Sequence, residues 1–272
     1  MKNYHNAFIG IVDILGYKNI EKRLDKYGQS PAQAIITNIF GFLDQNINNY
    51  NTHYTGVTWM RYGDGYICYS HDDNILHLIS IIRNSCMLIA LALNGTIPLR
   101  LAITQGDIKI DEPERGATVS GPGWDRLRDL EKRLDWMGGF LYLPNYDGKH
   151  YPTVTNLVQT TYLIIQQNHA QNEQHFKAPF KQGKELDSER TWFLNWHKCL
   201  HLPKNKQDEQ INNWWQNYGG CPTVNDGNDV KRKQENSKIF GNYCRILYEA
   251  ANLVYFSEID KSIKIGDINN GC

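Results

Sequence analysis

The sequence lacks net charge, long apolar runs and closely spaced cysteine pairs. Its 29 basic and 29 acidic residues cancel, so the chain has no overall field that would attract nucleic acid or an anionic membrane. The longest uninterrupted apolar stretch, Cys86 to Leu93, is too short to cross a bilayer, and no charged segment precedes a signal-like core at the N-terminus. None of the six cysteines has Cys-x-x-Cys spacing, which argues against a disulfide framework. We therefore expect a soluble, cytoplasmic protein with no nucleic-acid or membrane partner.

Enough apolar sequence is present for one large domain, or for one domain with an appendage, because 41% of the 272 residues are hydrophobic. The expected elements, in chain order, are a strand at 7–14, a helix from Ser30 through Ile47, a hairpin of strands 58–62 and 66–69, a helix from Ile75 to Leu93 capped by Asp72 and Asp73, and a hairpin of strands 99–104 and 108–110 around Gln105-Gly106-Asp107. This βαββαβ order predicts an α+β, ferredoxin-like fold, in which helices cover one face of an antiparallel or mixed sheet.

The pattern continues after residue 120. The further expected elements are a helix beginning near Trp124, a short strand at 140–143, a helical segment at 160–167, strands at 175–180 and 192–196, a polar connection at 203–238 and a last helix at 238–255. In the helix near Trp124, one side carries Trp124, Leu127 and Leu134, and the opposite face carries Asp125, Arg128, Asp129 and Lys132. That charged face is either solvated, or it is an interface or a phosphate-facing surface.

Two aspartates stand where a strand would normally bury apolar side chains. Asp13 ends the apolar run that begins at Phe8, and Asp64 sits in the turn Gly63-Asp64-Gly65. An unpaired carboxylate at such places is costly to desolvate, so a shared cationic partner, most simply a pair of divalent metals, would explain both. The first strand and the first hairpin are neighbours in a βαββαβ unit, which would bring the two acids together. The alternative is that both serve turns and caps only.

Several motifs of the chain, in this order, resemble those of the class III nucleotidyl cyclases. They are Val12-Asp13-Ile14-Leu15-Gly16-Tyr17, Gly63-Asp64-Gly65-Tyr66, the strand from Leu99 to Asp107, and Gly121-Pro122 with Leu130-Glu131. More narrowly, the Gly-Pro and Leu-Glu pairs, the segment Phe176 to Lys181 and the segment Trp192 to Trp196 are similar to the pyrimidine cyclases of bacterial Pycsar antiphage systems. The resemblance extends over residues 7–200.

The resemblance implies a two-metal site that acts on a nucleoside triphosphate. Asp13, the carbonyl of Ile14 and Asp64 would hold two Mn²⁺ or Mg²⁺ ions through oxygen ligands. The other nucleotide-binding residues that it implies are Leu15, Gly16, Tyr17, Lys177 and Lys181 for the phosphates, and Met60, Tyr62, Thr118 and Arg100 for the base.

The chain departs from the family at the groups that read a purine and at the catalytic helix. Met60 stands where purine cyclases have a base-reading lysine, and Thr118 stands where they have its acidic companion. Missing hydrogen-bond partners of this kind cost roughly 1–3 kcal/mol in discrimination, which argues against a purine substrate. Asp125 and Asp129 occupy the places of the family's asparagine and transition-state arginine, so Arg126, Arg128 or Lys132 would have to substitute. Of these, Arg128 is our candidate catalytic arginine, beside Asp13 and Asp64.

The resemblance therefore implies a uridylate cyclase that converts UTP to 3′,5′-cyclic UMP and pyrophosphate, as a second messenger in antiphage defence. A cytidylate cyclase is the nearest alternative, and a degenerate domain that binds nucleotide without turnover is another. A homodimer with shared active sites is expected, because class III sites form across two chains. We expect residues 5–200 to form the catalytic domain and residues 201–272 to form a polar and helical extension that packs on it.

Overall fold

The computed structural model describes residues 1–15, 17, 30–53, 56–94, 97–111, 117–134, 136–145, 164–166 and 190–194, together with single residues at 186, 196, 205–206, 208–209, 235 and 237–238. Within the first long helix, side chains are described from Thr37 onward. The predictions for 175–180 and for most of 160–167, 203–238 and 238–255 lie outside these residues.

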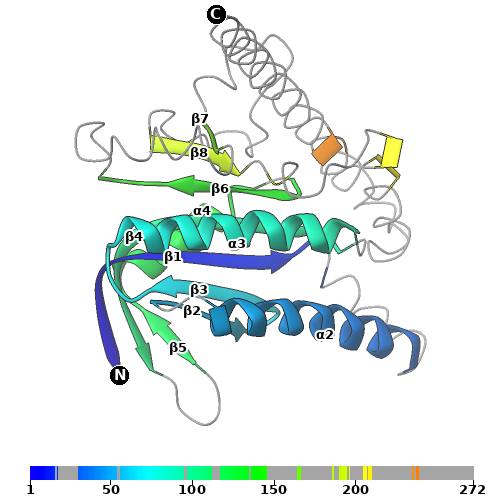
Figure 1. The fold of residues 1–272 in the computed structure, drawn as a ribbon, viewed down its shortest axis with the longest axis horizontal. Coiled ribbons are helices and arrows are strands. Elements are labelled where there is room, and N and C mark those ends of the chain that lie inside the picture. The colour runs from blue at the N-terminus through cyan, green and yellow to red at the C-terminus, as the bar shows by residue number, and fades with distance from the viewer. Residues whose placement is uncertain are drawn as a thin grey trace, which may run out of the picture.

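Helices and strands follow one another in the predicted βαββαβ order (Figure 1). The elements are β1 (Lys2–Ile14), α2 (Ser30–His53), β2 (Val57–Tyr62), β3 (Gly65–Ser70), α3 (Ile75–Asn94), β4 (Leu99–Asp111), β5 (Thr118–Ser120), α4 (Pro122–Glu131), β6 (Gly138–Tyr142), β7 (Ile164–Gln166) and β8 (Thr191–Leu194). The strand order is β2-β3-β1-β4-β6-β8-β7, with β5 paired to β4. The pairs among β1 to β4 are antiparallel, and β6 runs parallel to β4. The expected α+β fold with a mixed sheet is confirmed.

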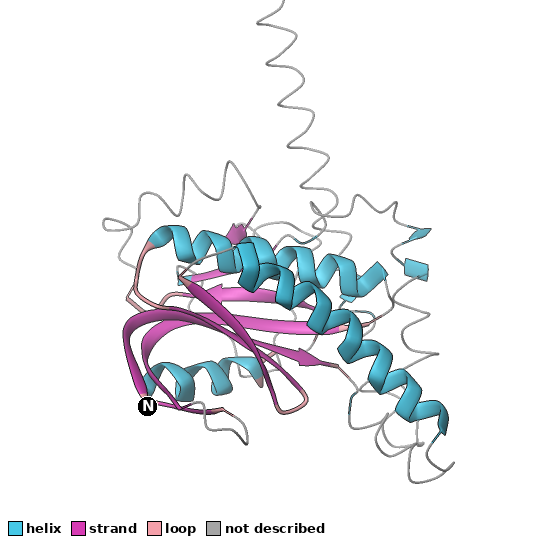
Figure 2. Ribbon diagram, turned by 60° about the horizontal axis from the view of Figure 1, so that its bottom comes forward, coloured by secondary structure: helices cyan, strands magenta, loops and turns pink. Residues whose placement is uncertain are grey.

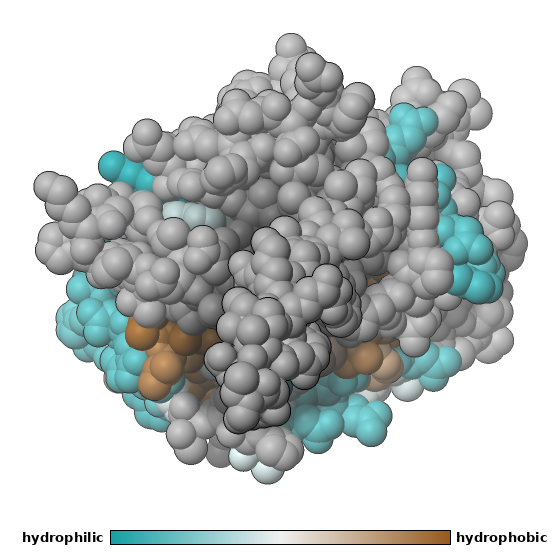
Figure 3. Space-filling model, turned by 45° about the horizontal axis from the view of Figure 1, so that its top comes forward, coloured by the Kyte–Doolittle hydropathy of each residue, from teal (hydrophilic) through white to brown (hydrophobic). Residues whose placement is uncertain are grey.

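Helices lie on both faces of the sheet rather than on one. α2 and α3 cover one face, as predicted, and α4 lies against the other (Figure 2). The two long helices bury apolar stripes that include Ile39, Leu43 and Ile47 of α2 and Cys86, Ile89 and Leu93 of α3. On the face that Figure 3 shows, the visible hydrophobic residues among those described lie in small areas of the surface. Burial of the stripes of α2 and α3 against the sheet provides much of the core.

The hairpin predicted at 99–110 is wrong, because β4 runs unbroken from Leu99 to Asp111. Gly106 looked like a turn residue, but its role is close packing: a Cβ there would lie 2.8 Å from Cα of Gly123 in α4. Arg126 fixes the same contact by donating a hydrogen bond to the Gln105 carbonyl at 2.7 Å. The long strand and the small residues therefore let α4 lie directly on the sheet.

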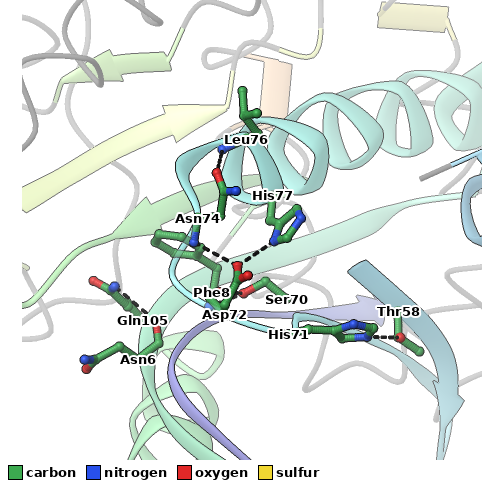
Figure 4. A network of polar contacts seen from close by, with 10 residues as sticks. All are labelled: Asn6, Phe8, Thr58, Ser70, His71, Asp72, Asn74, Leu76, His77 and Gln105. Carbon is green, nitrogen blue, oxygen red and sulfur yellow. Dashed lines mark hydrogen bonds and ion pairs between the residues drawn. The ribbon is translucent and has the colours of Figure 1, made fainter. Parts of the chain in front are cut away.

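Two other predicted elements differ from the structure. Residues 164–166 form the strand β7, where we expected a helical segment, because they pair with β8 through Ile164 and Leu194. The cap of α3 is Asn74, whose side-chain oxygen accepts a hydrogen bond from Leu76 N at 3.0 Å. Asp72 supports this turn from outside, since Oδ1 accepts hydrogen bonds from Asn74 N and from His77 Nδ1 (Figure 4). The cap is thus one residue later than Asp73.

α3 is more apolar over its length than the uninterrupted run Cys86–Leu93 suggested. Its segment Ile75–Leu93 has a mean hydropathy of 1.8 and is long and apolar enough to span a membrane by length and composition alone. However, 61% of the segment is buried inside the protein. This burial is typical of a helix that packs in a core.

One described residue of the expected C-terminal extension contacts the sheet region. Ser237 is fully buried, and its hydroxyl accepts a hydrogen bond from Met137 N at 2.8 Å. The division of the chain at residues 200 and 201 stays a prediction.

Candidate functional site

Asp13 lies at the end of β1 between two neighbouring strands. Its cross-strand partner on β3 is Gly65, and its partner on β4 is Arg100. Directly paired residues of adjacent strands project from the same face of a sheet. Asp13 and Arg100 therefore share the face against which α4 packs.

Gly65 allows the Asp64 turn to approach β1 closely. A Cβ on Gly65 would lie 2.1 Å from the carbonyl oxygen of Val12 and 3.5 Å from Cα of Asp13. Contacts below 3.0 Å between such atoms do not occur in folded proteins without displacement of the backbone. The glycine after Asp64 is thus required for the hairpin to pack beside Asp13.

Asp64 occupies the hairpin tip that the sequence predicts. β2 ends at Tyr62 and β3 begins at Gly65, so Gly63 and Asp64 are the two turn residues. Gly63 has a φ of +59°, which glycine adopts without steric cost. Asp64 itself is exposed. The turn therefore presents this carboxylate to solvent, beside the end of β1.

Arg100 bridges two carboxylates that come from different elements. Its Nε donates a hydrogen bond to Oδ2 of Asp13 at 2.7 Å, and its terminal nitrogen pairs with Oε1 of Glu131 in α4. The exposed fractions are 21% for Asp13, 19% for Arg100 and 13% for Glu131. Because the three groups are largely shielded from water, their mutual attraction is stronger than that of surface ion pairs.

These side chains line a cavity of about 570 Å³ at the end of β1, beside α4. The lining residues are Ile11, Val12, Asp13, Ile14, Leu15, Tyr17, Tyr62, Gly63, Asp64, Gly65, Arg100, Trp124, Arg128 and Glu131. Tyr62 and Trp124 form an edge-on aromatic pair with ring centroids 5.0 Å apart. The cavity thus combines three carboxylates, two arginines and aromatic rings, a lining suited to a charged ligand with a ring.

An aromatic and polar cluster on the opposite face fixes the hairpin to α2. Phe40 contacts the ring of Tyr17 with centroids 5.9 Å apart, and the guanidinium of Arg61 lies 3.7 Å above the Phe40 ring. The hydroxyl of Tyr66 donates a hydrogen bond to Asp44 at 2.6 Å. Burial, and then this hydrogen bond, raise the pKa of Tyr66 above its usual range. These contacts hold the strand next to Asp64 in place.

Most of the site residues proposed from the sequence converge on this cavity. Asp13, Ile14, Leu15, Tyr17, Tyr62, Asp64, Arg100 and Arg128 all line it. Met60 and Thr118 lie outside its lining, since Met60 is partly buried against the core and Thr118 pairs with Asp111 at the far end of β4. Gly16, Lys177 and Lys181 are outside the described residues.

Three expectations about charge need correction. The desolvation argument does not hold for Asp64, which is exposed, and the cation beside Asp13 in this structure is Arg100. Arg100 was expected to offer its hydrogen bonds to a base, but two of its nitrogens already contact Asp13 and Glu131. Arg128, assigned to the outer face of α4, is exposed but lines the cavity.

Sequence reasoning missed the roles of Trp124 and Glu131 in the site. Trp124, Arg128 and Glu131 are spaced i, i+4 and i+7 on α4, a spacing that places them along one stripe of a helix. That signal was available, but it identifies a shared stripe and not which surface the stripe meets. The close packing of Gly123 on Gly106 brings α4 onto the sheet, and the stripe lines the cavity beside Asp13.

The donor atoms at the cavity fit a divalent cation of a particular kind. In the part of the chain that the structure describes, no group of three or more His, Cys, Asp or Glu side chains could hold a metal ion. Two carboxylates, Asp13 and Asp64, are nevertheless the oxygen ligands that Mg²⁺ and Mn²⁺ favour. Mg²⁺ is commonly held by one or two carboxylates together with substrate phosphates. The donor set therefore fits an ion whose remaining ligands come from a bound substrate, and it does not fit a closed structural site.

No protein-family model and no curated protein matches the chain. Solved structures similar to it include the adenylyl cyclase CyaB from P. aeruginosa, at 12% identity over 71% of this chain and 96% of that chain, with a TM-score of 0.44. The guanylyl cyclase Cya2 has 12% identity over 71% of this chain and 93% of that chain, with a TM-score of 0.41. An adenylate cyclase from Trypanosoma brucei has 10% identity over 70% and 88% of the two chains, with a TM-score of 0.44. At such identities and scores, the function has to be argued from the residues of the cavity.

Proposed function

We propose that this protein is a nucleotidyl cyclase that converts UTP to 3′,5′-cyclic UMP and pyrophosphate. The observation that carries the proposal is the convergence of Asp13 and Asp64, far apart in the sequence, on one cavity that also contains Arg100 and Arg128. Acidic and basic groups together suit a ligand that is itself a complex of phosphate and divalent metal. The sequence resemblance to class III cyclases supports the same reaction.

The chain's own residues bind, orient and shield the substrate. Asp13 and Asp64, with the Ile14 carbonyl, would hold two Mn²⁺ or Mg²⁺ ions. When bound, the ions would favour ionisation of the ribose 3′-hydroxyl and neutralise the triphosphate while that oxygen attacks the α-phosphorus and pyrophosphate leaves. The segment from Leu15 to Tyr17 would bind phosphate oxygens through its backbone, and Arg128 would balance the charge of the departing pyrophosphate.

Further phosphate contacts and the choice of base rest on the resemblance. Lys177 and Lys181 are the proposed additional phosphate ligands. Tyr62 lines the cavity next to Trp124 and is the proposed contact of the base. Met60 and Thr118, at the positions of the purine-reading pair, offer no charged partner for a purine edge. A pyrimidine therefore fits better, with CTP as the alternative to UTP.

A homodimer would complete the site. The outer face of α4 exposes Asp125, Asp129 and Lys132, and its edge reaches the cavity through Arg128. A second copy of the chain placed over this face would contribute groups to the nucleotide, as in class III sites. The Pycsar resemblance assigns the product to antiphage signalling in the cytoplasm.

A nucleotide-binding domain without turnover is the second candidate, and one contact favours it. Arg100 already neutralises Asp13 in this structure, which would lower the affinity of that carboxylate for a metal. The two candidates differ in whether a covalent product forms.

The test is incubation of the purified chain with each of the four ribonucleoside triphosphates and Mn²⁺, followed by chromatography of the products. The proposal expects cyclic UMP and pyrophosphate from UTP, and neither product from an Asp64→Asn variant that still folds. Products from ATP or GTP alone would overturn the pyrimidine assignment. Nucleotide binding without any product would favour the second candidate.

A further inference from the structure

We propose that Arg100 competes with the divalent cation for Asp13 and thereby sets the metal affinity of the site. Glu131 holds Arg100 when the metal takes Asp13. The inference rests on the proposed function, since it takes Asp13 as a metal ligand. It adds two positioning residues, one of them in α4, that control how readily the metal binds.

The contacts of Arg100 carry the proposal. Arg100 projects from β4 directly opposite Asp13 on β1, so the strand register alone keeps the two side chains together. Nε of Arg100 donates to Oδ2 of Asp13 at 2.7 Å. On its other side, the same guanidinium pairs with Glu131. One cation is therefore shared between an acid of the sheet and an acid of the helix.

Competition follows from the geometry of this shared cation. The lone pair of Oδ2 that accepts the Arg100 hydrogen bond cannot at the same time coordinate a metal. The guanidinium charge also repels a second cation at the same carboxylate, and the low exposure of all three groups limits screening by water. A metal ion that binds Asp13 is therefore left with the other lone pairs of this carboxylate, beside a guanidinium that repels it, unless Arg100 moves away.

Glu131 makes that displacement easier. When Asp13 turns to the metal, Arg100 keeps a carboxylate partner in Glu131 and is not left as an unpaired, partly buried charge. Without Glu131, Arg100 would depend on Asp13 alone. Glu131 is therefore expected to favour metal binding by retaining Arg100, without itself being a ligand.

Arg128 offers a matched control for charge. It lines the same cavity as Arg100 and is also an arginine, but it is exposed on α4. Removing Arg128 subtracts the same positive charge from the cavity without changing the Arg100 contact to Asp13. A difference in Mn²⁺ affinity between the Arg100 and Arg128 variants is therefore due to the contact of Arg100 with Asp13 and not to the net charge of the cavity.

The experiment measures binding of Mn²⁺ to the full chain without nucleotide, using the electron paramagnetic resonance signal of free Mn²⁺. The proteins are the wild type, Arg100→Gln, Arg128→Gln, Glu131→Gln, the Arg100→Gln/Glu131→Gln double variant and Asp64→Asn. Arg100→Lys is added in case Arg100→Gln does not fold, because lysine keeps the charge but loses the forked geometry of the guanidinium. Thermal unfolding of each variant checks that it folds.

Arg100→Gln should tighten Mn²⁺ binding by about tenfold, and Arg128→Gln should tighten it by no more than about twofold. Arg100→Lys should give an intermediate gain. Glu131→Gln should weaken binding several-fold when Arg100 is present, and by a clearly smaller factor in the Arg100→Gln background, because coupled residues are not additive.

Three results would overturn the inference. The first is unchanged or weaker binding in both Arg100→Gln and Arg100→Lys. The second is an equal gain in Arg128→Gln, which would make the effect one of charge alone. The third is an equal loss from Glu131→Gln in both backgrounds, which would make Glu131 a ligand or a remote charge. Wild-type binding that Asp64→Asn leaves intact would instead contradict the proposed function.

Discussion

Gly65 lies directly against the carbonyl group of Val12, so close that a Cβ at this position would be 2.1 Å from the carbonyl oxygen. The contact joins the hairpin that carries Asp64 to the strand that carries Asp13. A single hydrogen atom in place of a side chain is therefore a condition for the two carboxylates to line one cavity.

Gly65→Ala is expected to destabilise the protein by about 2–3 kcal/mol, because the added methyl group must push β3 away from β1. It should also weaken Mn²⁺ binding, since Asp64 moves with the hairpin. Urea unfolding and Mn²⁺ titration check the two effects. The matched control is Gly41→Ala in α2, where a Cβ meets nothing within 4 Å and alanine should add up to about 1 kcal/mol of stability. Equal stability of the two variants would contradict the close approach.

Replacing each aspartate by asparagine should have different effects on folding. Asp64→Asn should change the free energy of unfolding by no more than about 0.5 kcal/mol, because Asp64 is exposed in a turn. Asp13→Asn should cost about 1–3 kcal/mol, because Arg100 loses a charged partner in a partly buried place. Both should abolish product formation. Equal stability of the two variants would show that the ion pair between Asp13 and Arg100 contributes nothing to the free energy of unfolding.

The turn before α3 should be sensitive to acid through Asp72. The Asn74 N–H, and to a smaller extent His77, hold the pKa of Asp72 below its usual value (Figure 4). Because the folded pKa lies below the unfolded one, the stabilisation is present above about pH 4 and is lost as the pH falls through the folded pKa. Asp72→Ala should therefore cost about 0.5–1 kcal/mol at pH 7, with allowance for solvent screening, and less at pH 3.

The control for this pH effect is Asp73→Ala, which removes an exposed neighbouring carboxylate. Chemical unfolding at both pH values should show no change beyond about 0.5 kcal/mol for the control. A loss of stability from Asp72→Ala that stays the same at pH 3 and pH 7 would mean that the charge of Asp72 has no part in it.

The Tyr66–Asp44 hydrogen bond should stabilise the hairpin at neutral pH, and this stabilisation should be lost at alkaline pH. Tyr66→Phe is expected to cost about 1 kcal/mol at pH 7, because Asp44 loses its donor. The pKa of Tyr66 is raised in the folded state, so this stabilisation is present below the unfolded pKa of about 10 and is lost as the pH rises toward the folded value. Wild type should lose more stability than Tyr66→Phe between pH 9 and pH 11, measured by thermal unfolding. An equal loss of stability in wild type and Tyr66→Phe would contradict a contribution of the Tyr66 hydroxyl to this pH dependence.

The hairpin and the position of Asp13 could be predicted from the sequence because their signals are local. Gly63-Asp64-Gly65 between two apolar runs predicts a tight turn, and the order of elements makes the first strand and this hairpin neighbours. The same local reasoning misread Gly106, whose glycine serves the packing of α4 and not a turn. A glycine required by a distant helix has no signature in its own neighbourhood.

The ion pairs of Arg100 could not be predicted, because they depend on register and on helix position. A shift of one residue between β1 and β4 would turn Arg100 to the opposite face from Asp13. The contact with Glu131 further requires that α4 lie on this face of the sheet. Only the stripe of Trp124, Arg128 and Glu131 could have been read from spacing alone.

A crystal structure of the chain with Mn²⁺ and a nonhydrolysable UTP analogue would test the proposed metal and nucleotide site most directly, with the anomalous signal of manganese used to locate the ions. We predict manganese bound by the carboxylates of Asp13 and Asp64, with the triphosphate beside them and the Arg100 side chain drawn toward Glu131. Manganese bound elsewhere, or a nucleotide bound away from Asp13 and Asp64, would contradict it.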